Sequence, residues 1–299
     1  MDRQRLLIVG FGYFGRFLTR ILDRDRYEIY GTTRFAESFQ ELLDQDVIPI
    51  QLDVVNPQHS DLGGMQFDTI VYCVGFDRNG QSSKQTVYVD GLRRFLNQIQ
   101  APSRNFVYVS STGVYGQKLG EWVTETSETS PSGESGRICL QAEEALLAAE
   151  LNCPVTILRF AGIYGPNRVP NLNRLKGTTE PDTLMPVAQN SFLNLIHVAD
   201  AAAISRCLME SSADKQEVEF FNVADGNPVD RRDFYTEVAR QSGVGLPRFR
   251  VPVSAELGVG RGSTSKKVSN RKLVAHTRYQ FLFPSYQQGL IEALKPQND

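Results

Sequence analysis

The sequence predicts an α/β protein built on a doubly wound parallel sheet, with a smaller discontinuous lobe towards the C-terminus. In the first half, short apolar and β-branched runs alternate with longer amphipathic stretches, the pattern of repeated βαβ units. Several of these runs are apolar without alternation, as expected of strands covered on both faces. The 299 residues exceed a typical domain of about 100–200 residues, which leaves room for the second lobe.

The individual elements follow from periodicity and composition. Apolar residues at helical spacing lie between the runs, beginning with Phe14, Phe17 and Leu18. Beyond residue 165 a segment rich in Pro, Asn and Thr is long enough to favour a functional role. The C-terminal part carries predicted helices in RRDFYTEVARQSG and near SYQQGLIEAL, separated by a basic, Ser-rich stretch at 260–272. The predicted strands are 5–10, 27–34, 47–54, 68–75, 105–112, 155–165, 191–198 and 220–225.

These elements divide the chain into two predicted domains. Residues 1–165 and 191–225 form the sheet domain, and residues 166–190 and 226–299 form the smaller lobe. The lobe is therefore built from two separated pieces of chain.

Composition excludes several classes of protein. A hydrophobic content of 41% with 22% charged residues is that of an ordinary soluble globular chain. A net charge of −2 gives no attraction towards nucleic acid or anionic membranes. The four cysteines form no CxxC pair, and the three histidines are dispersed, so we expect neither a metal site nor disulfides. With no signal-peptide core or spanning segment, a cytoplasmic location is expected, although a cleaved organellar peptide stays open.

Three glycines at the N-terminus predict a dinucleotide site. Gly10, Gly12 and Gly15 form GxGxxG directly after a predicted strand and at the start of a predicted helix, which indicates a Rossmann-type fold. The first glycine permits the tight turn, the second admits a pyrophosphate, and the third allows close helix packing. The helix N-terminus, with Tyr13 and Phe14, supplies NH donors to the phosphates. The alternative is a glycine turn that only connects strand to helix.

The end of the second strand predicts the preferred cofactor. The sequence GTTRF offers Thr33 and Arg34 where an NAD-specific site carries a carboxylate. A guanidinium suits a 2′-phosphate, so NADP is favoured over NAD. A solvated Arg34 at a strand end is the alternative.

Two further residues are candidate contacts to the adenosine side of the cofactor. Asp53 follows VIPIQL, near the end of the predicted strand 47–54, and can accept a hydrogen bond from the adenine amino group or else cap the next turn. Gly75 follows IVYC, where it lets the chain pass close to the cofactor, or is a simple loop glycine.

Several segments together resemble the extended short-chain dehydrogenase/reductases, the NAD(P)-dependent epimerase/dehydratase family. They are GFGYFG, VYVDGLRRFL, YVSSTGVYG, LRFAGIYGPNR, LNLIHVADAA, FFNVADG and FPSYQQGL, in family order over nearly the whole chain. The resemblance implies a nicotinamide cofactor, a small-molecule substrate and, as a family expectation, a homodimer. The glycine spacing departs from the family's GxxGxxG, because Val9 stands at its first glycine.

The resemblance also implies a catalytic set that this chain carries only in part. In the family, a Ser or Thr after the fifth strand works with a Tyr-x-x-x-Lys pair and an upstream Asn, the Tyr serving as general acid/base. Ser111 matches the Ser or Thr, with capping or turn formation as its alternative role. Depending on the anchor used for the helix, the Tyr position is Ser135 or Gly136, and the Lys position is Cys139 or Leu140. The Asn position offers Tyr88 and Asp90. We therefore expect an atypical member of the family.

Substitutes for the missing groups are available on segments that converge at the carboxyl edge of the sheet. Tyr115 and Tyr164, and also Tyr13, are candidate phenols, and Arg137 is a candidate for positioning an anion or stabilising an oxyanion. A packed amphipathic ring is the alternative role of each tyrosine.

The second lobe concentrates basic residues in a chain of slightly negative net charge. This segregation favours an anionic substrate such as a nucleotide-sugar or a phosphorylated compound, with solvated surface charge as the alternative. With the family resemblance, it makes the smaller lobe the predicted substrate-binding domain and the sheet domain the predicted NAD(P)-binding domain. His197 and Asp200 match a family segment that is usually structural. The basic residues are Arg168, Arg174, Lys176, Arg261, Lys266, Lys267, Arg271 and Lys272.

Two functional hypotheses follow. The first is an NADP-binding oxidoreductase-like or epimerase/dehydratase-like enzyme acting on a small, anionic carbonyl or hydroxyl compound, with hydride transfer carried by the cofactor. The second is a catalytically degenerate, NADP(H)-binding sensor or regulatory scaffold. The missing Tyr and Lys favour the sensor, whereas Ser111 and the full second lobe favour the enzyme.

Overall fold

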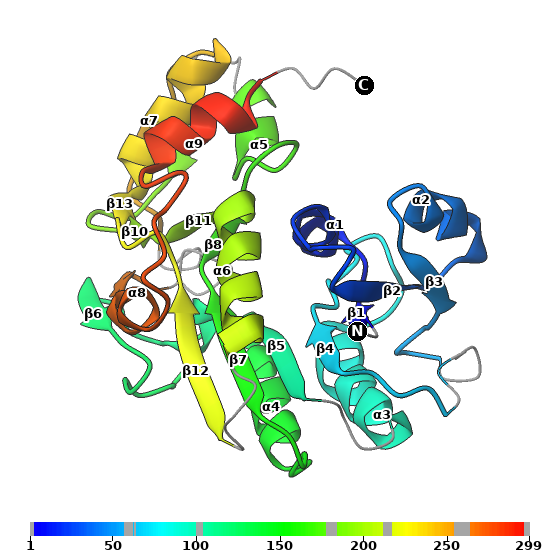
Figure 1. The fold of residues 1–299 in the computed structure, drawn as a ribbon. Helices are drawn as coiled ribbons and strands as arrows, with labels where there is room; N and C mark the ends of the chain where they lie inside the picture. The colour runs from blue at the N-terminus through cyan, green and yellow to red at the C-terminus, as the bar shows by residue number, and fades with distance from the viewer. Residues whose placement is uncertain are drawn as a thin grey trace. The chain divides into compact units, whose positions relative to one another are not determined.

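The computed structural model describes residues 3–56, 62, 64–99, 104–177, 184–211, 217–253 and 264–295. Its main sheet has seven strands in the order β12-β7-β5-β4-β1-β2-β3 (Figure 1). The strands are β1 (Gln4–Val9), β2 (Tyr27–Thr33), β3 (Ile48–Gln51), β4 (Thr69–Tyr72), β5 (Asn105–Ser111), β7 (Val155–Phe160) and β12 (Val218–Val223).

The order of the strands places a topological switch between β1 and β4. The pairings of β1 with β2 and β4, of β2 with β3, and of β4 with β5 are all parallel. Described helices lie between β1 and β2, between β2 and β3, and between β4 and β5, as is usual for parallel connections. The predicted fold class, a Rossmann-type α/β protein, is confirmed. The helices are α1 (Tyr13–Arg20), α2 (Phe39–Leu43), α3 (Gly91–Gln98), α4 (Glu134–Leu147) and α6 (Val198–Ser211).

Burial explains why these segments form strands. All four residues of β4 and the last four of β1 are buried, so their continuous apolar runs are covered on both faces. One core cluster joins these strands to α3 and α4 through Leu7, Ile70, Phe95, Phe106 and Ala142.

Smaller elements complete the described chain. They include a π-helical turn, η2 (Thr86–Asp90), directly before α3. A second cluster contains Tyr164, Leu195, Phe234 and Leu290. The remaining elements are β6 (Glu121–Val123), β8 (Gly162–Tyr164), α5 (Leu172–Gly177), β9 (Leu184–Pro186), β10 (Phe192–Leu193), β11 (Leu195–His197), β13 (Val229–Asp230), α7 (Arg231–Ser242), β14 (Arg248–Arg250), β15 (Lys266–Val268), α8 (Arg271–Thr277) and α9 (Tyr286–Ala293).

Two predicted strands are each divided in the structure. The run 155–165 becomes β7 and β8, because after Phe160 the chain leaves the main sheet and β8 pairs with β11. The run 191–198 becomes β10 and β11, separated by Asn194. Its side-chain amide donates to Lys266 O (2.9 Å) and its side-chain oxygen accepts from Val268 N (2.7 Å), which holds the break in place.

The chain separates into two compact units. Unit 1 contains residues 1–111, 135–159 and 202–221, and unit 2 contains residues 112–134, 160–201 and 222–299. Unit 2 therefore contains more residues than the predicted smaller lobe does. The assignment of cofactor and substrate to the predicted domains stays a prediction.

Candidate functional site

The first glycine of the loop in unit 1 is required by its backbone. Gly10 has φ +89°, and a Cβ built on it would lie 2.7 Å from Val74 Cα. The Cys73 thiol donates to Gly10 O (3.3 Å), and Cys73 N donates to Val9 O (2.9 Å). No other residue type fits this turn, which is held against the end of β4.

The second and third glycines open the start of α1. Gly12 is the N-cap residue, and a Cβ built on it would meet only Gly10 O, at 4.0 Å. At Gly15 a Cβ would lie 3.2 Å from the Ile8 side chain, so this glycine allows α1 to pack against β1. The approach to the helix N-terminus is open at Gly12, which fits a pyrophosphate seated on backbone NH groups.

The two side chains that follow Gly12 have different surroundings. Phe14 is buried in the core of unit 1. The Tyr13 ring is partly buried and packs on Phe17, with ring centroids 5.3 Å apart. Any contribution of these two residues to a phosphate site therefore comes from the backbone, since both rings are engaged in packing.

The end of β2 is tied to the glycine loop. Gly10 N donates to Thr32 Oγ1 (2.9 Å), and Phe11 N donates to Thr32 O (3.0 Å). Next along the chain, Thr33 Oγ1 accepts from Phe35 N (3.4 Å). The loop and the strand end that the sequence assigns to one site thus lie together in unit 1.

Arg34 carries an interaction that the sequence did not indicate. Its guanidinium forms an ion pair with Asp77 at 3.0 Å, and both side chains are nearly half exposed. The hydrogen bond from Arg34 lowers the pKa of Asp77, with a further contribution from the backbone NH of Asn79. A 2′-phosphate bound by Arg34 has to compete with this carboxylate.

The structure places Asp53 and Gly75 differently. Asp53 Oδ1 accepts from Val55 N (2.9 Å), which is the turn-capping role considered as its alternative. Gly75 is exposed, and a Cβ built on it would meet no atom within 4 Å. An adenosine contact at either residue stays a prediction.

Ser111 and Arg137 both belong to unit 1. Ser111 is the last residue of β5 and is partly buried, whereas Arg137 is exposed on the first turns of α4. The neighbouring Ser110 donates to Glu143 of α4 at 2.5 Å. Glu143 also forms a buried ion pair with Arg159 at 2.7 Å. This network fixes α4 against the carboxyl end of β5.

Tyr115 and Tyr164 are both fully buried in unit 2. The Tyr115 hydroxyl donates to Asn222 Oδ1 at 2.8 Å. Burial raises the pKa of Tyr164 far above its ordinary value, with the nearby Asp225 as the next cause. A Cβ built on Gly289 would overlap the Tyr164 hydroxyl, so that oxygen faces close-packed backbone. These surroundings favour the packing role for both rings.

Sequence reasoning missed a lysine that lies close to α4. Lys84 Nζ donates to Ser135 Oγ at 2.6 Å, and it lies 5.7 Å from the centroid of the Phe76 ring. The Phe76 ring in turn packs against Tyr88 of η2, with centroids 6.3 Å apart. Lys84 precedes Ser135 by 51 residues. No local motif in the sequence could have indicated this contact.

The basic residues of the predicted lobe do not form a single cluster of exposed cations. Lys266 is buried and donates to Tyr115 O (2.9 Å) and Thr264 Oγ1 (3.2 Å), which is a correction to its role as a surface cation. Lys267 Nζ lies 4.5 Å from the centroid of the Phe192 ring. Arg174, Lys176, Arg271 and Lys272 are exposed, and Arg168 donates to Ile163 O at 3.4 Å. Arg261 lies outside the described residues.

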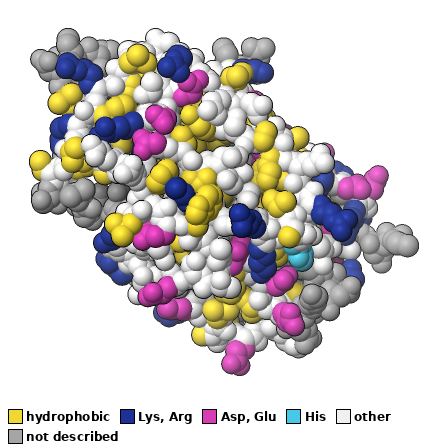
Figure 2. All heavy atoms as spheres, turned by 90° about the vertical axis from the view of Figure 1, so that its left-hand side faces the viewer, with side chains coloured by type: hydrophobic (Ala, Val, Ile, Leu, Met, Phe, Trp, Pro, Cys, Tyr) yellow, Lys and Arg dark blue, Asp and Glu magenta, His cyan; other side chains and the backbone are white. Residues whose placement is uncertain are grey.

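One face of the molecule shows basic and acidic side chains interspersed, with apolar ones among them (Figure 2). The described residues contain no group of three or more His, Cys, Asp or Glu that could hold a metal ion. None of the described helices is long and apolar enough to serve as a transmembrane segment. His197 and Asp200 are buried, and Asp200 accepts from Tyr279 and from two backbone NH groups, in keeping with a structural role.

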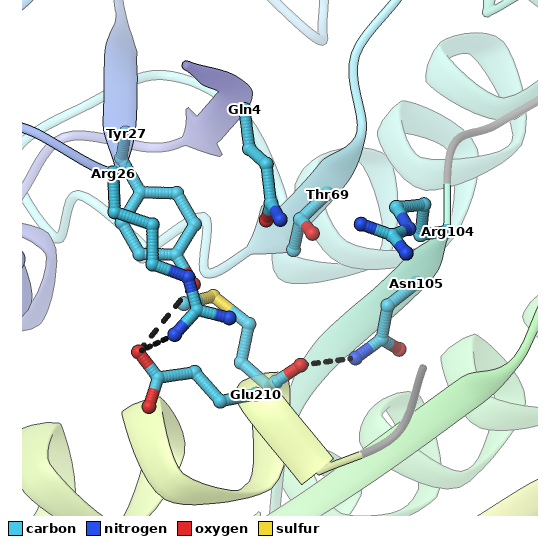
Figure 3. A pocket seen from close by; sticks show the side chains of 8 residues that line it. Gln4, Arg26, Tyr27, Thr69, Arg104, Asn105 and Glu210 are labelled. Carbon is cyan, nitrogen blue, oxygen red and sulfur yellow. Dashed lines mark hydrogen bonds and ion pairs between the residues drawn. The ribbon is translucent and has the colours of Figure 1, made fainter. Parts of the chain in front are cut away.

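A small polar pocket lies at the amino-terminal ends of the main-sheet strands, opposite the ends that carry the glycine loop (Figure 3). Its lining includes Gln4, Tyr27, Thr69 and Asn105, each at the start of its strand. Its volume of about 30 Å³ is that of a water-sized space. Because α/β folds bind ligands at the carboxyl ends of strands, this pocket is distinct from the site around the glycine loop.

Comparison with known proteins agrees with this fold. The family model described as "NAD dependent epimerase/dehydratase family" matches residues 6–224. Protein YeeZ of Escherichia coli K12 is 26% identical over 276 residues, covering 89% of this chain and 93% of YeeZ.

Two solved structures extend the comparison. One, from Methylobacillus flagellatus and assigned to the NAD-dependent epimerases/dehydratases, has a TM-score of 0.75 at 31% identity, covering 98% of each chain. The other is a UDP-glucuronic acid 4-epimerase from Bacillus cereus, solved in complex with a UDP-sugar and NAD. Its TM-score is 0.76 at 18% identity, covering 97% of this chain and 98% of the epimerase.

Proposed function

Because the chain belongs to the NAD-dependent epimerase/dehydratase family, we propose that it binds a nicotinamide adenine dinucleotide along Gly10–Gly15. The observation that carries this proposal is the glycine loop itself. Gly10 adopts a backbone conformation that only glycine tolerates well, and Gly12 leaves the start of α1 open. When bound, the dinucleotide supplies the hydride acceptor or donor, and the protein supplies orientation and electrostatics.

The proposed substrate is a small anionic nucleotide-sugar with a hydroxyl or carbonyl group at the reacting carbon. Support comes from the Bacillus cereus epimerase, whose structure contains a UDP-sugar and NAD. The exposed cations Arg174, Lys176, Arg271 and Lys272 are available to an anionic ligand in unit 2.

The finer proposal is a preference for NADP. Arg34 offers a guanidinium at the end of β2, and no carboxylate of β2 occupies the position that would select NAD. The ion pair with Asp77 opposes this preference, although an exposed pair contributes only about 0–1 kcal/mol. A 2′-phosphate, with two charges and three acceptor oxygens, can displace one carboxylate.

Thermal unfolding in the presence of NAD, NADP and their reduced forms tests the proposal. A ligand at 100 times its dissociation constant stabilises the folded state by about 2.7 kcal/mol, so binding raises the melting temperature. We expect Arg34→Gln to weaken NADP binding about tenfold and to leave NAD binding unchanged. Asp77→Asn, which frees the guanidinium, should strengthen NADP binding by up to about fivefold. No shift with any of the four dinucleotides would remove the proposed site.

A second candidate function is an NADP(H)-binding sensor or regulatory scaffold. It is favoured by α4, which carries no Tyr and no Lys between Glu134 and Leu147. Two assays separate the two functions: oxidation of NADH and NADPH in the presence of aldehydes and ketones, and product analysis after incubation of nucleotide-sugars with NAD or NADP. Turnover with any of these compounds supports the enzyme, and dinucleotide binding without turnover across the set supports the sensor.

A further inference from the structure

Lys84 and Ser135 form a close pair within unit 1. The Lys84 ammonium donates to Ser135 Oγ at 2.6 Å, which makes this a short hydrogen bond. Lys84 is partly buried, and its Nζ lies 5.7 Å from the centroid of the Phe76 ring. Ser135 is exposed, so its hydroxyl is accessible to a bound molecule.

The backbone on both sides of the pair is fixed. Ser83, directly before Lys84, accepts a hydrogen bond from Thr86 N (3.0 Å) and starts the turn that continues into η2. π-Helical turns are rare and are frequent at functional sites. On α4, Ser135, Cys139 and Glu143 follow one another at intervals of four residues and therefore lie on one face. Glu143 fixes that face to Ser110 and Arg159.

The pair lies beyond the carboxyl end of the sheet. Ser110, near the end of β5, bonds to Glu143, and Ser135 lies eight residues earlier on α4, which is about 12 Å along the helix axis. Because α4 follows β5 and runs back along the sheet, its N-terminal turns lie at the carboxyl edge. Lys84 belongs to the connection that follows β4, at the same edge. Ligands of open α/β sheets bind there.

Cys139 lies between Ser135 and Glu143 on this face, and it is less suited to proton transfer than Ser135. Burial raises the pKa of its thiol to about 11, Glu143 raises it further, and Lys84 lowers it. The thiol therefore stays protonated at neutral pH and is a weak hydrogen-bonding group. A hydroxyl joined to an ammonium is the stronger relay, because the ammonium is charged and can be replenished from solvent.

We propose that Lys84 and Ser135 are the proton-transfer couple of the nicotinamide site. The assignment rests on the dinucleotide-binding function proposed above. In the reducing direction the substrate carbonyl carbon receives the hydride, Ser135 gives its hydroxyl proton to the carbonyl oxygen, and Lys84 replaces that proton from its ammonium. The products are an alcohol, the oxidised dinucleotide and a neutral Lys84 amine, which regains a proton from water. In the oxidising direction each proton moves the opposite way.

The first test does not depend on turnover. Lysine side chains are methylated reductively with an isotopic label, and the Lys84 signal is identified by its loss in Lys84→Met. If the pair faces the nicotinamide, adding NAD⁺ shifts the Lys84 signal, because a cationic aromatic ring then lies next to the labelled amine. The Lys118 signal, from an exposed side chain of unit 2, should stay unchanged. Dinucleotide binding that leaves the Lys84 signal unchanged overturns the assignment.

The second test measures reaction rates with UDP-glucose and UDP-glucuronic acid as probes. Lys84→Met and Ser135→Ala should each bind NAD as the wild type does and lower kcat at least 100-fold, the usual contribution of general acid/base catalysis. Lys84→Arg, which keeps the charge but does not release a proton, should also bind NAD as the wild type does and should not recover kcat. Lys118→Met should retain the wild-type rate.

The outcomes of these tests distinguish a failure of the Lys84–Ser135 couple from a failure of the proposed function. Wild-type rates in Lys84→Met or Ser135→Ala overturn the couple. Absence of dinucleotide binding in the wild type overturns the proposed function and with it the couple. If the wild type binds NAD but converts neither probe, the nucleotide-sugar proposal fails, and the Lys84 signal decides the couple.

Discussion

Gly10 and Gly12 stand two residues apart and have different physical requirements. Gly10 needs a positive φ and has no room for a Cβ, because the backbone of Val74 lies within 2.7 Å of that position. Gly12 has an ordinary extended backbone, with φ −100°, and space around it. The first glycine is therefore required for folding, and the second is available for binding.

Alanine at each position should separate these requirements. We expect Gly10→Ala to destabilise the protein by more than about 2 kcal/mol, since it adds left-handed strain to a backbone clash. Gly12→Ala should cost about 1 kcal/mol or less, the typical effect of alanine at an N-cap, yet weaken dinucleotide binding at least tenfold. Urea unfolding and a dinucleotide titration measure the two effects.

Gly245→Ala is the matched control for both variants. A Cβ built on Gly245 meets no atom within 4 Å, and the residue lies in unit 2. Its stability and its dinucleotide affinity should equal those of the wild type. If Gly12→Ala binds the dinucleotide as tightly as this control does, the pyrophosphate does not pass over Gly12.

Some features of single residues could be predicted from the sequence, and others could not. The glycine spacing and the strand end at Arg34 could be predicted, because each depends on neighbours within about 25 positions. The partners of Arg34 and Ser135 could not be predicted. Asp77 lies 43 residues from Arg34, and Lys84 lies 51 residues from Ser135, so both contacts exist only once the sheet has formed.

At the scale of elements, the position of α4 depends on one buried charge. Glu143 accepts from Ser110 and from two nitrogens of Arg159, and the exposed fractions of the Arg159 and Glu143 side chains are 6% and 2%. The Arg159 guanidinium also lies 4.6 Å from the centroid of the Phe220 ring. Three strands, β5, β7 and β12, therefore meet α4 at this network.

Neutralising Glu143 should destabilise the protein strongly. Glu143→Gln leaves Arg159 buried without a counter-charge, and the loss of one partner of a buried pair typically costs about 3–5 kcal/mol. Glu144→Gln, at the next and exposed position of the same helix, should change stability by less than about 0.5 kcal/mol. Chemical denaturation compares the two variants. Equal stabilities would mean that the network does not anchor α4.

Elements were predicted well where burial is continuous and less well where a side chain interrupts the backbone pairing. The strands β1, β2 and β5 match the predicted apolar runs to within a residue or two. The break between β10 and β11 at Asn194 could not be seen in the sequence pattern, because the hydrogen bonds of Asn194 go to β15, more than 70 residues later in the chain. The predicted strand 191–198 was therefore too long.

At the scale of the whole molecule, the two units alternate along the chain. Each consists of three segments, so the polypeptide crosses from one unit to the other five times. No composition shift marks these crossings, since several occur at ends of strands of the main sheet. The stability of either unit thus depends on residues that are far apart in sequence, and a buried ionisable group in one unit makes the stability of that unit depend on pH.

Asp225 is such a group in unit 2. It is buried, its Oδ1 accepts from Asn227 N at 2.9 Å, and its Oδ2 has no hydrogen-bond partner among the described residues. Burial raises the pKa of Asp225 to about 7, the bond from Asn227 lowers it, and Asp200 raises it. Between about pH 4 and pH 7 the folded state therefore holds a proton that the unfolded chain has released.

The stability of the protein should fall as pH rises through this window. A folded state that binds more protons than the unfolded state loses stability with increasing pH, here by on the order of 4 kcal/mol in total. Asp225→Asn carries no titrating group at this position and should lack this slope. The free energy of unfolding of the variant should therefore rise relative to that of the wild type between pH 4 and pH 7. His197, whose pKa is lowered by burial, adds an opposite slope that is present in both proteins and cancels in the comparison.

Asp233→Asn, which removes an exposed carboxylate of the same unit, should leave the wild-type slope. Urea unfolding at each pH provides the free energies, and parallel curves for the wild type and Asp225→Asn would show that Asp225 is ionised in the folded protein throughout.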